Sequence, residues 1–337
     1  MSIVRKLKNG IYSFLAGTRV LDILVYIVMR LFVRIFRLVA TTGRGSNICL
    51  KHGFLPLPVH FYSPVPDIND LEKRDIWGKR NELRGIDFRS NEQKKLLKEL
   101  GVRFSEECQW PLELNENSPE FYLKNPSFSY GCAASTHCMI RYYKPNAVVE
   151  IGSGMSSRVI ARALRLNGWS KNTQYIIVDP YPSDIIKNGS LGIPNLVKKR
   201  VEMLDPSFFE QLKENDILFI DSGHCVRIGG DVNYLFLNIL PLLKPGVIVH
   251  IHDVNLPYEY PKTYATNKIF RQFWTEQYLL QSFLCFNSAF EVLLAMSYLM
   301  KDHGEYFREA FPFYNPDIHP FISGSFWMRR KLQVKQQ

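Results

Sequence analysis

The chain reads AVVEIGSGMSS from residue 147 to residue 157, and an apolar segment typical of a helix follows. The first five of these residues are mostly apolar, which predicts a short buried strand. Glycines at a strand-to-helix turn let the backbone approach a ligand closely, and the start of the helix presents free N–H groups. We therefore predict that Glu150, Gly152, Ser153 and Gly154 form a ligand-binding loop.

Around this loop the sequence alternates between short apolar segments and helix-like segments. Strands are expected at 147–151, 174–179, 200–204, 217–221, 247–253, 291–295 and 325–329. Helices are expected at 91–100 (ending at Gly101), 131–143, 157–167, 232–243 and 262–286. Apolar strands separated by helices indicate a parallel sheet covered on both faces. The predicted fold is α/β: a Rossmann-like, doubly wound, mostly parallel sheet of seven strands, one of them reversed, with an N-terminal helical extension.

Asp179 closes the second expected strand, beside the glycine loop. An acid at this place accepts hydrogen bonds from the hydroxyls of a ribose. The alternative role is the capping of a helix or turn. The loop and Asp179 together predict a ribose-bearing ligand.

Acids and histidines gather where the fourth and fifth expected strands end. The fourth strand runs into Asp221-Ser222-Gly223-His224, and the fifth ends in His252-Asp253. A parallel sheet places both strand ends on the same edge as the glycine loop. We therefore expect these four charged side chains to share one cleft, while His250 faces the opposite side of the sheet.

In these features the region from about 120 to 330 resembles the class I S-adenosylmethionine-dependent methyltransferases. Glu150, Gly152 and Gly154 match the family's first motif, whose turn contacts the methionine part of the cofactor. The resemblance implies that Asp179 holds the ribose and that Asp205 contacts the adenine amine, although Asp205 stands equally well placed to cap a helix at Pro206. The third glycine often found in the motif is Ser156 here.

The Asp-x-x-His and His-Asp pattern resembles a branch of O-methyltransferases that includes macrolide-sugar and cephalosporin-pathway enzymes. The resemblance implies that Asp221 and Asp253, with His252, hold Mg²⁺ or another divalent cation. It also implies that His224 is the general base, acting with Asp221. A hydroxyl acceptor is a poor nucleophile until it is deprotonated, and a cation or a histidine assists that step. Capping of helices by these acids is the structural alternative.

The N-terminal segment is basic. Residues 1–45 hold eight Lys and Arg residues and one acid, Asp22, so they carry +7 of the chain's net charge of +10. The remaining charge indicates no nucleic-acid-binding face. The six cysteines form no Cys-x-x-Cys pair, which is typical of reduced thiols in a cytoplasmic protein.

Residues 19–41 predict one helix, because their polar residues recur every three or four positions and form a single stripe. The stripe consists mainly of arginines, and arginine in the middle of a bilayer is costly. We expect the helix to lie at a membrane surface, on the inner face, with its arginines reaching anionic head groups. Packing within the protein, packing in a homo-oligomer, and a targeting peptide are the alternatives.

The sequence thus suggests a membrane-anchoring helix at 1–45, a cap or substrate region at 46–130 and a methyltransferase domain at 131–337. The expected activity is S-adenosylmethionine-dependent methylation of a hydroxyl on a sugar, glycan or related metabolite, without a nucleic-acid partner. One alternative is a nicotinamide-dependent oxidoreductase, although its glycine motif requires glycine at Ser157. A second is a non-catalytic, membrane-associated scaffold that retains the fold.

Overall fold

The computed structural model describes residues 19–115, 118–169, 173–193, 195–267, 271–318 and 322–332. Residues 1–18, which include three basic residues of the N-terminal segment, lie outside this description. The chain divides into two compact units with a boundary between Arg74 and Asp75.

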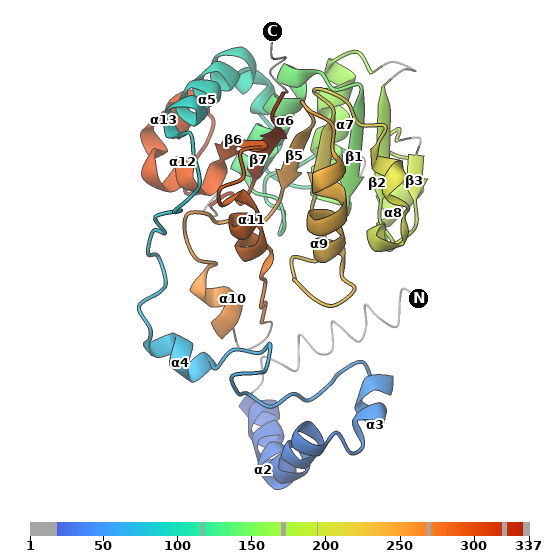
Figure 1. Ribbon diagram of the computed structural model, residues 1–337, viewed down its shortest axis with the longest axis vertical. Helices are drawn as coiled ribbons and strands as arrows, with labels where there is room; N and C mark the ends of the chain where they lie inside the picture. Colours follow the sequence, from blue (N-terminus) through green and yellow to red (C-terminus); the bar gives the residue numbers. More distant parts are fainter. Residues whose placement is uncertain are drawn as a thin grey trace. The chain divides into compact units, whose positions relative to one another are not determined.

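The second unit is built on a seven-stranded sheet with the order β3-β2-β1-β4-β5-β7-β6 (Figure 1). The strands are β1 (Ala147–Ile151), β2 (Gln174–Val178), β3 (Asn195–Val197), β4 (Ile217–Ile220), β5 (Ile248–Ile251), β6 (Phe290–Ala295) and β7 (Phe326–Arg330). All neighbouring pairs from β3 to β5 are parallel, whereas β7 is antiparallel to both β5 and β6. The predicted seven-stranded, mostly parallel sheet with one reversed strand is confirmed.

The central strands are buried along their whole length, as their apolar sequences require. Their register aligns their carboxyl ends, because Ile151 pairs with Ile220 and Ile220 pairs with Ile251. The residues that follow β1, β4 and β5 therefore leave the sheet at the same edge. This alignment positions the candidate site.

Helices flank the sheet (Figure 1). Those of the second unit are α5 (Ser90–Phe104), α6 (Tyr130–Tyr143), α7 (Met155–Leu166), α8 (Asp184–Lys187), α9 (Asp231–Tyr234), α10 (Lys262–Thr266), α11 (Glu276–Leu284), α12 (Met296–Asp302) and α13 (Gly304–Ala310). Short 3-10 helices are η1 (Ser105–Cys108), η2 (Val201–Met203), η3 (Pro206–Phe209) and η5 (Leu240–Leu242). A π-helical segment, η4 (Leu235–Ile239), joins α9 to η5, so the expected helix at 232–243 is continuous but irregular.

Three expectations from the sequence are wrong: the position of one strand, the end of one helix and the continuity of another helix. The strand expected at 200–204 is the 3-10 helix η2, and the third strand is the three-residue segment β3 instead. Helix α5 continues through Gly101, which is buried against Ala310: a Cβ there would lie 2.5 Å from the Ala310 carbonyl oxygen. That glycine therefore permits close packing and does not end the helix.

The long helix expected at 262–286 is also wrong, since only α10 and α11 are helical there. Residues 271–275 are not helical, and 268–270 lie outside the described residues. The backbone N–H groups of Thr275 and Glu276 donate to the carbonyl of His224, at 2.9 and 3.1 Å. Tertiary contacts with the loop after β4 therefore set the start of α11.

The first unit contains α2 (Arg19–Thr42), α3 (Ser46–Lys51) and α4 (Ile68–Lys73). The predicted helix at 19–41 is confirmed by α2. No residue from 21 to 74 is buried, although many are large and apolar. Within the described residues, no helix combines the length and apolar character needed to cross a membrane.

Candidate active site

The glycine loop connects β1 to α7 at the carboxyl edge of the sheet. Gly152 has a φ of 84°, which glycine adopts readily, and a Cβ there would lie only 1.9 Å from the Asp221 backbone carbonyl oxygen. Only glycine fits at this crossing. The contact holds the loop directly against the end of β4, where the charged cluster begins.

Glu150 lies beneath the loop and is fully buried. Its carboxylate accepts hydrogen bonds from the hydroxyls of Ser156 at 2.7 Å, Ser157 at 2.9 Å and Tyr175 at 2.5 Å. Burial raises the pKa of Glu150 to about 7, although these hydrogen bonds oppose the shift. Glu150 therefore fixes the loop to the first turn of α7. The same contacts give Ser156, which stands at the position of the family's third glycine, a structural role.

Asp179 immediately follows β2 and faces the same loop. Its Oδ2 accepts from the Ser153 hydroxyl at 2.5 Å, and its Oδ1 accepts from the Tyr181 N–H at 2.7 Å. A Cβ on Gly154 would meet no atom within 4 Å, so the space beside the loop is open there. The predicted cofactor residues Gly152, Ser153, Gly154 and Asp179 are thus brought together.

Asp205 is exposed and caps η3, where its carboxylate accepts from the Ser207 N–H at 2.9 Å. The hydrogen bonds with Ser207 lower the pKa of Asp205. The helix-capping interpretation of this residue is confirmed. Its contact with adenine stays a prediction.

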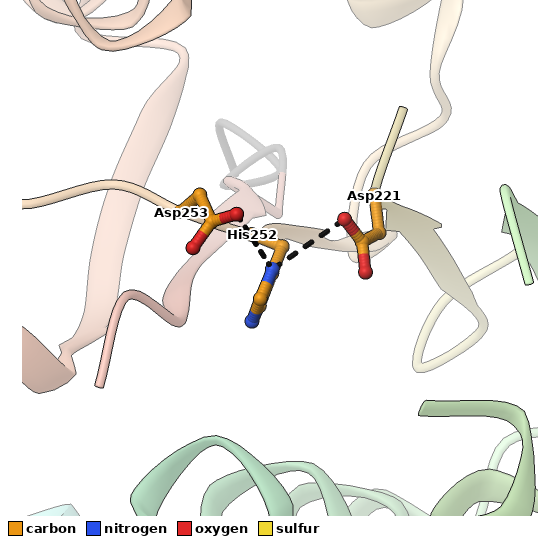
Figure 2. A group of neighbouring side chains, drawn as sticks. All are labelled: Asp221, His252 and Asp253. Carbon is orange, nitrogen blue, oxygen red and sulfur yellow. Dashed lines mark ion pairs between the residues drawn. The ribbon is translucent and has the colours of Figure 1, made fainter. Parts of the chain in front are cut away.

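The predicted acids and histidines converge at the ends of β4 and β5. Figure 2 shows Asp221, His252 and Asp253 directed toward one another from these two strand ends. The Nδ1 atom of His252 lies 3.4 Å from Asp221 Oδ1 and 3.4 Å from Asp253 Oδ2. The Nε2 atom of His224 lies 3.4 and 3.6 Å from the same two oxygens. The two carboxylates are therefore flanked by two imidazoles.

Because these side chains are largely enclosed, the charge of each one affects the pKa of its neighbours. The side chains of His252 and His224 are only 4% and 9% exposed, whereas the two aspartates are about a quarter exposed. Although burial opposes both shifts, the neighbouring imidazoles lower the pKa of Asp221, and the two aspartates raise that of His252. Asp253 has a φ of 57°, which is rare for a residue other than glycine and frequent at functional sites.

His224 also has a left-handed backbone, with a φ of 54°. Its Nδ1 atom lies 2.9 Å from Oε2 of Glu276, a carboxylate whose side chain is 1% exposed. The Trp274 ring covers His224 with a centroid separation of 4.5 Å. Burial lowers the pKa of His224, but its contacts with Asp221 and Glu276 overcome this effect and raise it to about 10. Sequence reasoning missed Glu276, because no motif connects it to His224.

The expected orientation of His250 is wrong. Residues two positions apart on a strand face the same side, and the rings of His250 and His252 are accordingly 6.0 Å apart. His250 is nevertheless part of the packing: its ring stacks on Phe219 at 3.8 Å, and its Nε2 shares a hydrogen bond of 2.9 Å with the Ser325 hydroxyl.

Asp221, His252 and Asp253 fit a divalent cation. One donor atom from each lies within 4.8 Å of the others. In the described part of the chain neither nitrogen of the buried His252 ring makes a hydrogen bond. Carboxylate oxygens suit Mg²⁺ and Mn²⁺, and an imidazole nitrogen beside them suits Zn²⁺. The residues predicted as a metal set therefore lie close enough together to act as one.

Two comparisons with known proteins concern the sequence. Residues 149–254 match the family model described as a methyltransferase domain. An uncharacterized protein of Archaeoglobus fulgidus is 35% identical over 181 residues, which cover 52% of this chain and 81% of that protein.

Among solved structures, the SAH-bound methyltransferase PaMTH1 of Podospora anserina is 15% identical, with a TM-score of 0.37 over 72% of this chain and 88% of that one. The plantazolicin methyltransferase BamL, solved with a triazolic desmethylPZN analog and SAH, is 12% identical, with a TM-score of 0.35 over 73% of this chain and 100% of that one. A putative protein-L-isoaspartate O-methyltransferase of Plasmodium falciparum is 13% identical, with a TM-score of 0.28 over 55% and 81% of the two chains.

The matched domain begins within β1 and ends one residue after Asp253, so it contains both the glycine loop and the charged cluster. The sheet has the seven strands and the single reversed strand expected for that domain. Residues 149–254 therefore form a methyltransferase domain, and the sheet has the Rossmann-like fold expected of class I S-adenosylmethionine-dependent methyltransferases.

Proposed function

We propose that the chain methylates a hydroxyl oxygen of a small-molecule or glycan acceptor, such as a sugar, with the help of a divalent cation. The observation that carries this proposal is the contact between Gly152 and the Asp221 carbonyl oxygen. It supports a reaction centre in which the cofactor loop and the acid–histidine cluster adjoin. The O-methyltransferase branch that the sequence resembles has the same pattern of residues.

On the cofactor side, the loop residues provide an open space beside Gly154. Gly152, Ser153 and Gly154 would contact the methionine part, Asp179 the ribose and Asp205 the adenine. Glu150 would support the loop from below, because its oxygens are already engaged by three hydroxyls. When bound, S-adenosylmethionine supplies a methyl group on a sulfonium, which the acceptor oxygen takes as the C–S bond breaks.

On the acceptor side, His224 would take the proton of the hydroxyl at Nε2, and Asp221 would assist as its neighbour 3.4 Å away. Asp221, Asp253 and His252 would hold a divalent cation, which lowers the pKa of a bound hydroxyl and offsets the carboxylate charges that raise the pKa of His224. In-line displacement depends mainly on positioning. The strand ends and the left-handed backbones of His224 and Asp253 would supply it.

The direct test is methyl transfer from labelled S-adenosylmethionine to a panel of mono- and oligosaccharides. The proposal predicts a base-stable methyl ether on an acceptor hydroxyl, lost after treatment with a chelator and restored by Mg²⁺ or Mn²⁺. His224→Asn should lower the rate while leaving the affinity for S-adenosylhomocysteine unchanged. Transfer to nitrogen or carbon, or a rate indifferent to the chelator, would overturn the corresponding part of the proposal.

We also propose that α2 lies on the inner face of a membrane. Between residues 23 and 66 the chain has five Lys and Arg residues and no acid, a charge that complements anionic lipids. Ile23, Leu31 and Leu38 are among the many α2 side chains that are more than half exposed, and Phe61 and Tyr62 are more than four-fifths exposed. Exposed apolar side chains beside arginines are typical of an interfacial helix.

Flotation with vesicles tests this location. The full-length protein should float with vesicles that contain phosphatidylserine, and less with phosphatidylcholine alone. The triple substitution Arg30→Gln, Arg34→Gln and Arg37→Gln should reduce flotation. If the protein remains in the bottom fraction with every vesicle composition and forms a stable dimer through α2, a membrane site is contradicted and a homo-oligomer is supported.

A further inference from the structure

A buried carboxylate stands behind the candidate base. Glu276 is the first residue of α11, and its side chain is 1% exposed. Its Oε2 lies 2.9 Å from His224 Nδ1, and its other oxygen makes no hydrogen bond with any described residue. Burying a carboxylate is costly unless it is paired and hydrogen-bonded. His224 is therefore the partner that keeps this acid in place.

The backbone on both sides reinforces this pair. The N–H groups of Thr275 and Glu276 both donate to the carbonyl of His224, and the Thr275 hydroxyl accepts from the Val226 N–H at 2.7 Å. Trp274 covers the ring itself. Residues 274–276 thus contact His224 at its backbone, at its ring and at one ring nitrogen.

We propose that Glu276 is a positioning residue that sets the tautomer and the orientation of His224. Its carboxylate accepts the Nδ1–H, so Nε2 remains as the nitrogen directed between Asp221 and Asp253. The inference rests on the proposed function, in which the acceptor hydroxyl gives its proton to Nε2 as its oxygen bonds to the methyl carbon. The positive charge that the ring then gains lies against Glu276. The proton later leaves from Nε2 to solvent.

The Nδ1 proton and its hydrogen bond are observable without an acceptor, whether or not Nε2 also carries a proton. In protein labelled with ¹⁵N-histidine, the signal that disappears in His224→Asn identifies the His224 ring. We expect an Nδ1-bound proton at high chemical shift, protected from exchange, in the wild type. In Glu276→Gln this proton should move to lower chemical shift and exchange faster, because a neutral amide accepts more weakly than a carboxylate. Glu276→Asp keeps the charge and should lie between the two.

Glu291→Gln is the matched control. Glu291 on β6 is also a largely enclosed carboxylate, 12% exposed, but it pairs with Arg89 and with Arg329 of β7. This variant should leave the His224 signal unchanged, even if its melting temperature falls. If Glu276→Gln and Glu276→Asp both show the wild-type signal, or if the proton resides on Nε2 alone in the wild type, the inference is wrong.

Calorimetry with S-adenosylhomocysteine separates this inference from the proposed function. A wild-type protein that does not bind this ligand overturns the proposed function. Wild type and Glu276→Gln that bind equally, together with an altered His224 signal, support the positioning role. Once an acceptor is known, Glu276→Gln should lower kcat with little change in KM, and Glu276→Asp should recover part of kcat.

Discussion

The two halves of the site differ in how completely their polar atoms are hydrogen-bonded within the protein. At the ends of β1 and β2, every carboxylate oxygen of Glu150 and Asp179 accepts a hydrogen bond. At the ends of β4 and β5, the carboxylates and imidazoles of Asp221, His252 and Asp253 approach only to 3.4 Å, and His252 makes no hydrogen bond in the described chain.

This difference indicates two kinds of preorganisation. Buried polar groups are normally hydrogen-bonded. The carboxylates around the cofactor loop are hydrogen-bonded already, so a ligand would bind to a preformed surface. The charged cluster contains the buried His252 ring, whose nitrogens make no hydrogen bond in the described chain, and a bound cation would satisfy the Nδ1 atom beside the two aspartates. We therefore expect changes in the first region to act on folding and cofactor binding, and changes in the second to act on metal binding and catalysis.

The largest effect is expected for Gly152→Ala. Its Cβ would collide with the Asp221 carbonyl oxygen, and the residue would keep a left-handed backbone. Strain and overpacking together should lower the free energy of unfolding by about 4 kcal/mol and abolish binding of S-adenosylhomocysteine. Urea denaturation and calorimetry measure both. Gly154→Ala is the control, since its Cβ meets open space, and it should unfold like the wild type.

Glu150→Gln should change how stability depends on pH. Because burial raises the pKa of Glu150 from 4.5 to about 7, the folded state holds this proton more tightly than the unfolded state. Glu150 therefore makes the wild type less stable as pH rises from about 4.5 to about 7, by as much as about 3 kcal/mol. Glutamine cannot titrate, so that decline should be missing in the variant. Parallel stability curves for the two proteins between pH 4.5 and 8 would show that folding does not raise the pKa of Glu150.

Asp253→Asn tests the charged cluster. Loss of one carboxylate should weaken Mn²⁺ binding by roughly 100-fold or more, since removing even an outer partner of a metal ligand costs 10- to 100-fold. Binding of S-adenosylhomocysteine should stay near the wild-type value. Asp184→Asn, which removes an exposed carboxylate from α8, is the control and should bind Mn²⁺ normally. Equal Mn²⁺ affinity in all three proteins would exclude a cation site at this cluster.

The smallest effects compare Asp179 with Ser153. Asp179→Asn should lower the affinity for S-adenosylhomocysteine by roughly 10-fold, as expected for losing a hydrogen bond to a charged group. Ser153→Ala should change it by less than about 3-fold, because the serine hydroxyl occupies an Asp179 oxygen that a ribose would also use. Calorimetry compares the two variants directly. A larger loss in Ser153→Ala than in Asp179→Asn would reverse the roles given to these residues.

The sequence predicts the central sheet well because β1, β2, β4 and β5 are short apolar segments with polar residues at their ends. It fails for β3, an edge strand of three residues that starts with Asn195, while the apolar residues 201–204 form a 3-10 helix instead. The segment 262–286 has helical periodicity, yet its break is fixed by contacts with the loop after β4. Such tertiary contacts override local preference.

The site residues also fall into some that the sequence predicts and some that it does not. Asp179, Asp221, His252 and Asp253 are predictable because the ends of parallel strands meet at one edge. Glu276 is not, since it lies 52 residues from His224 and is placed by the fold around it. The orientation of His250 follows from strand geometry alone, and the expectation failed because it ignored that geometry.

The most direct test of a shared reaction centre is anomalous diffraction from crystals grown with S-adenosylhomocysteine and Mn²⁺. We expect a Mn²⁺ peak bonded to Asp221, Asp253 and His252, with the ligand's ribose on Asp179 and its sulfur facing His224 across the glycine loop. A nucleoside bound elsewhere, or an anomalous map without a peak at these three residues at saturating Mn²⁺, would contradict it.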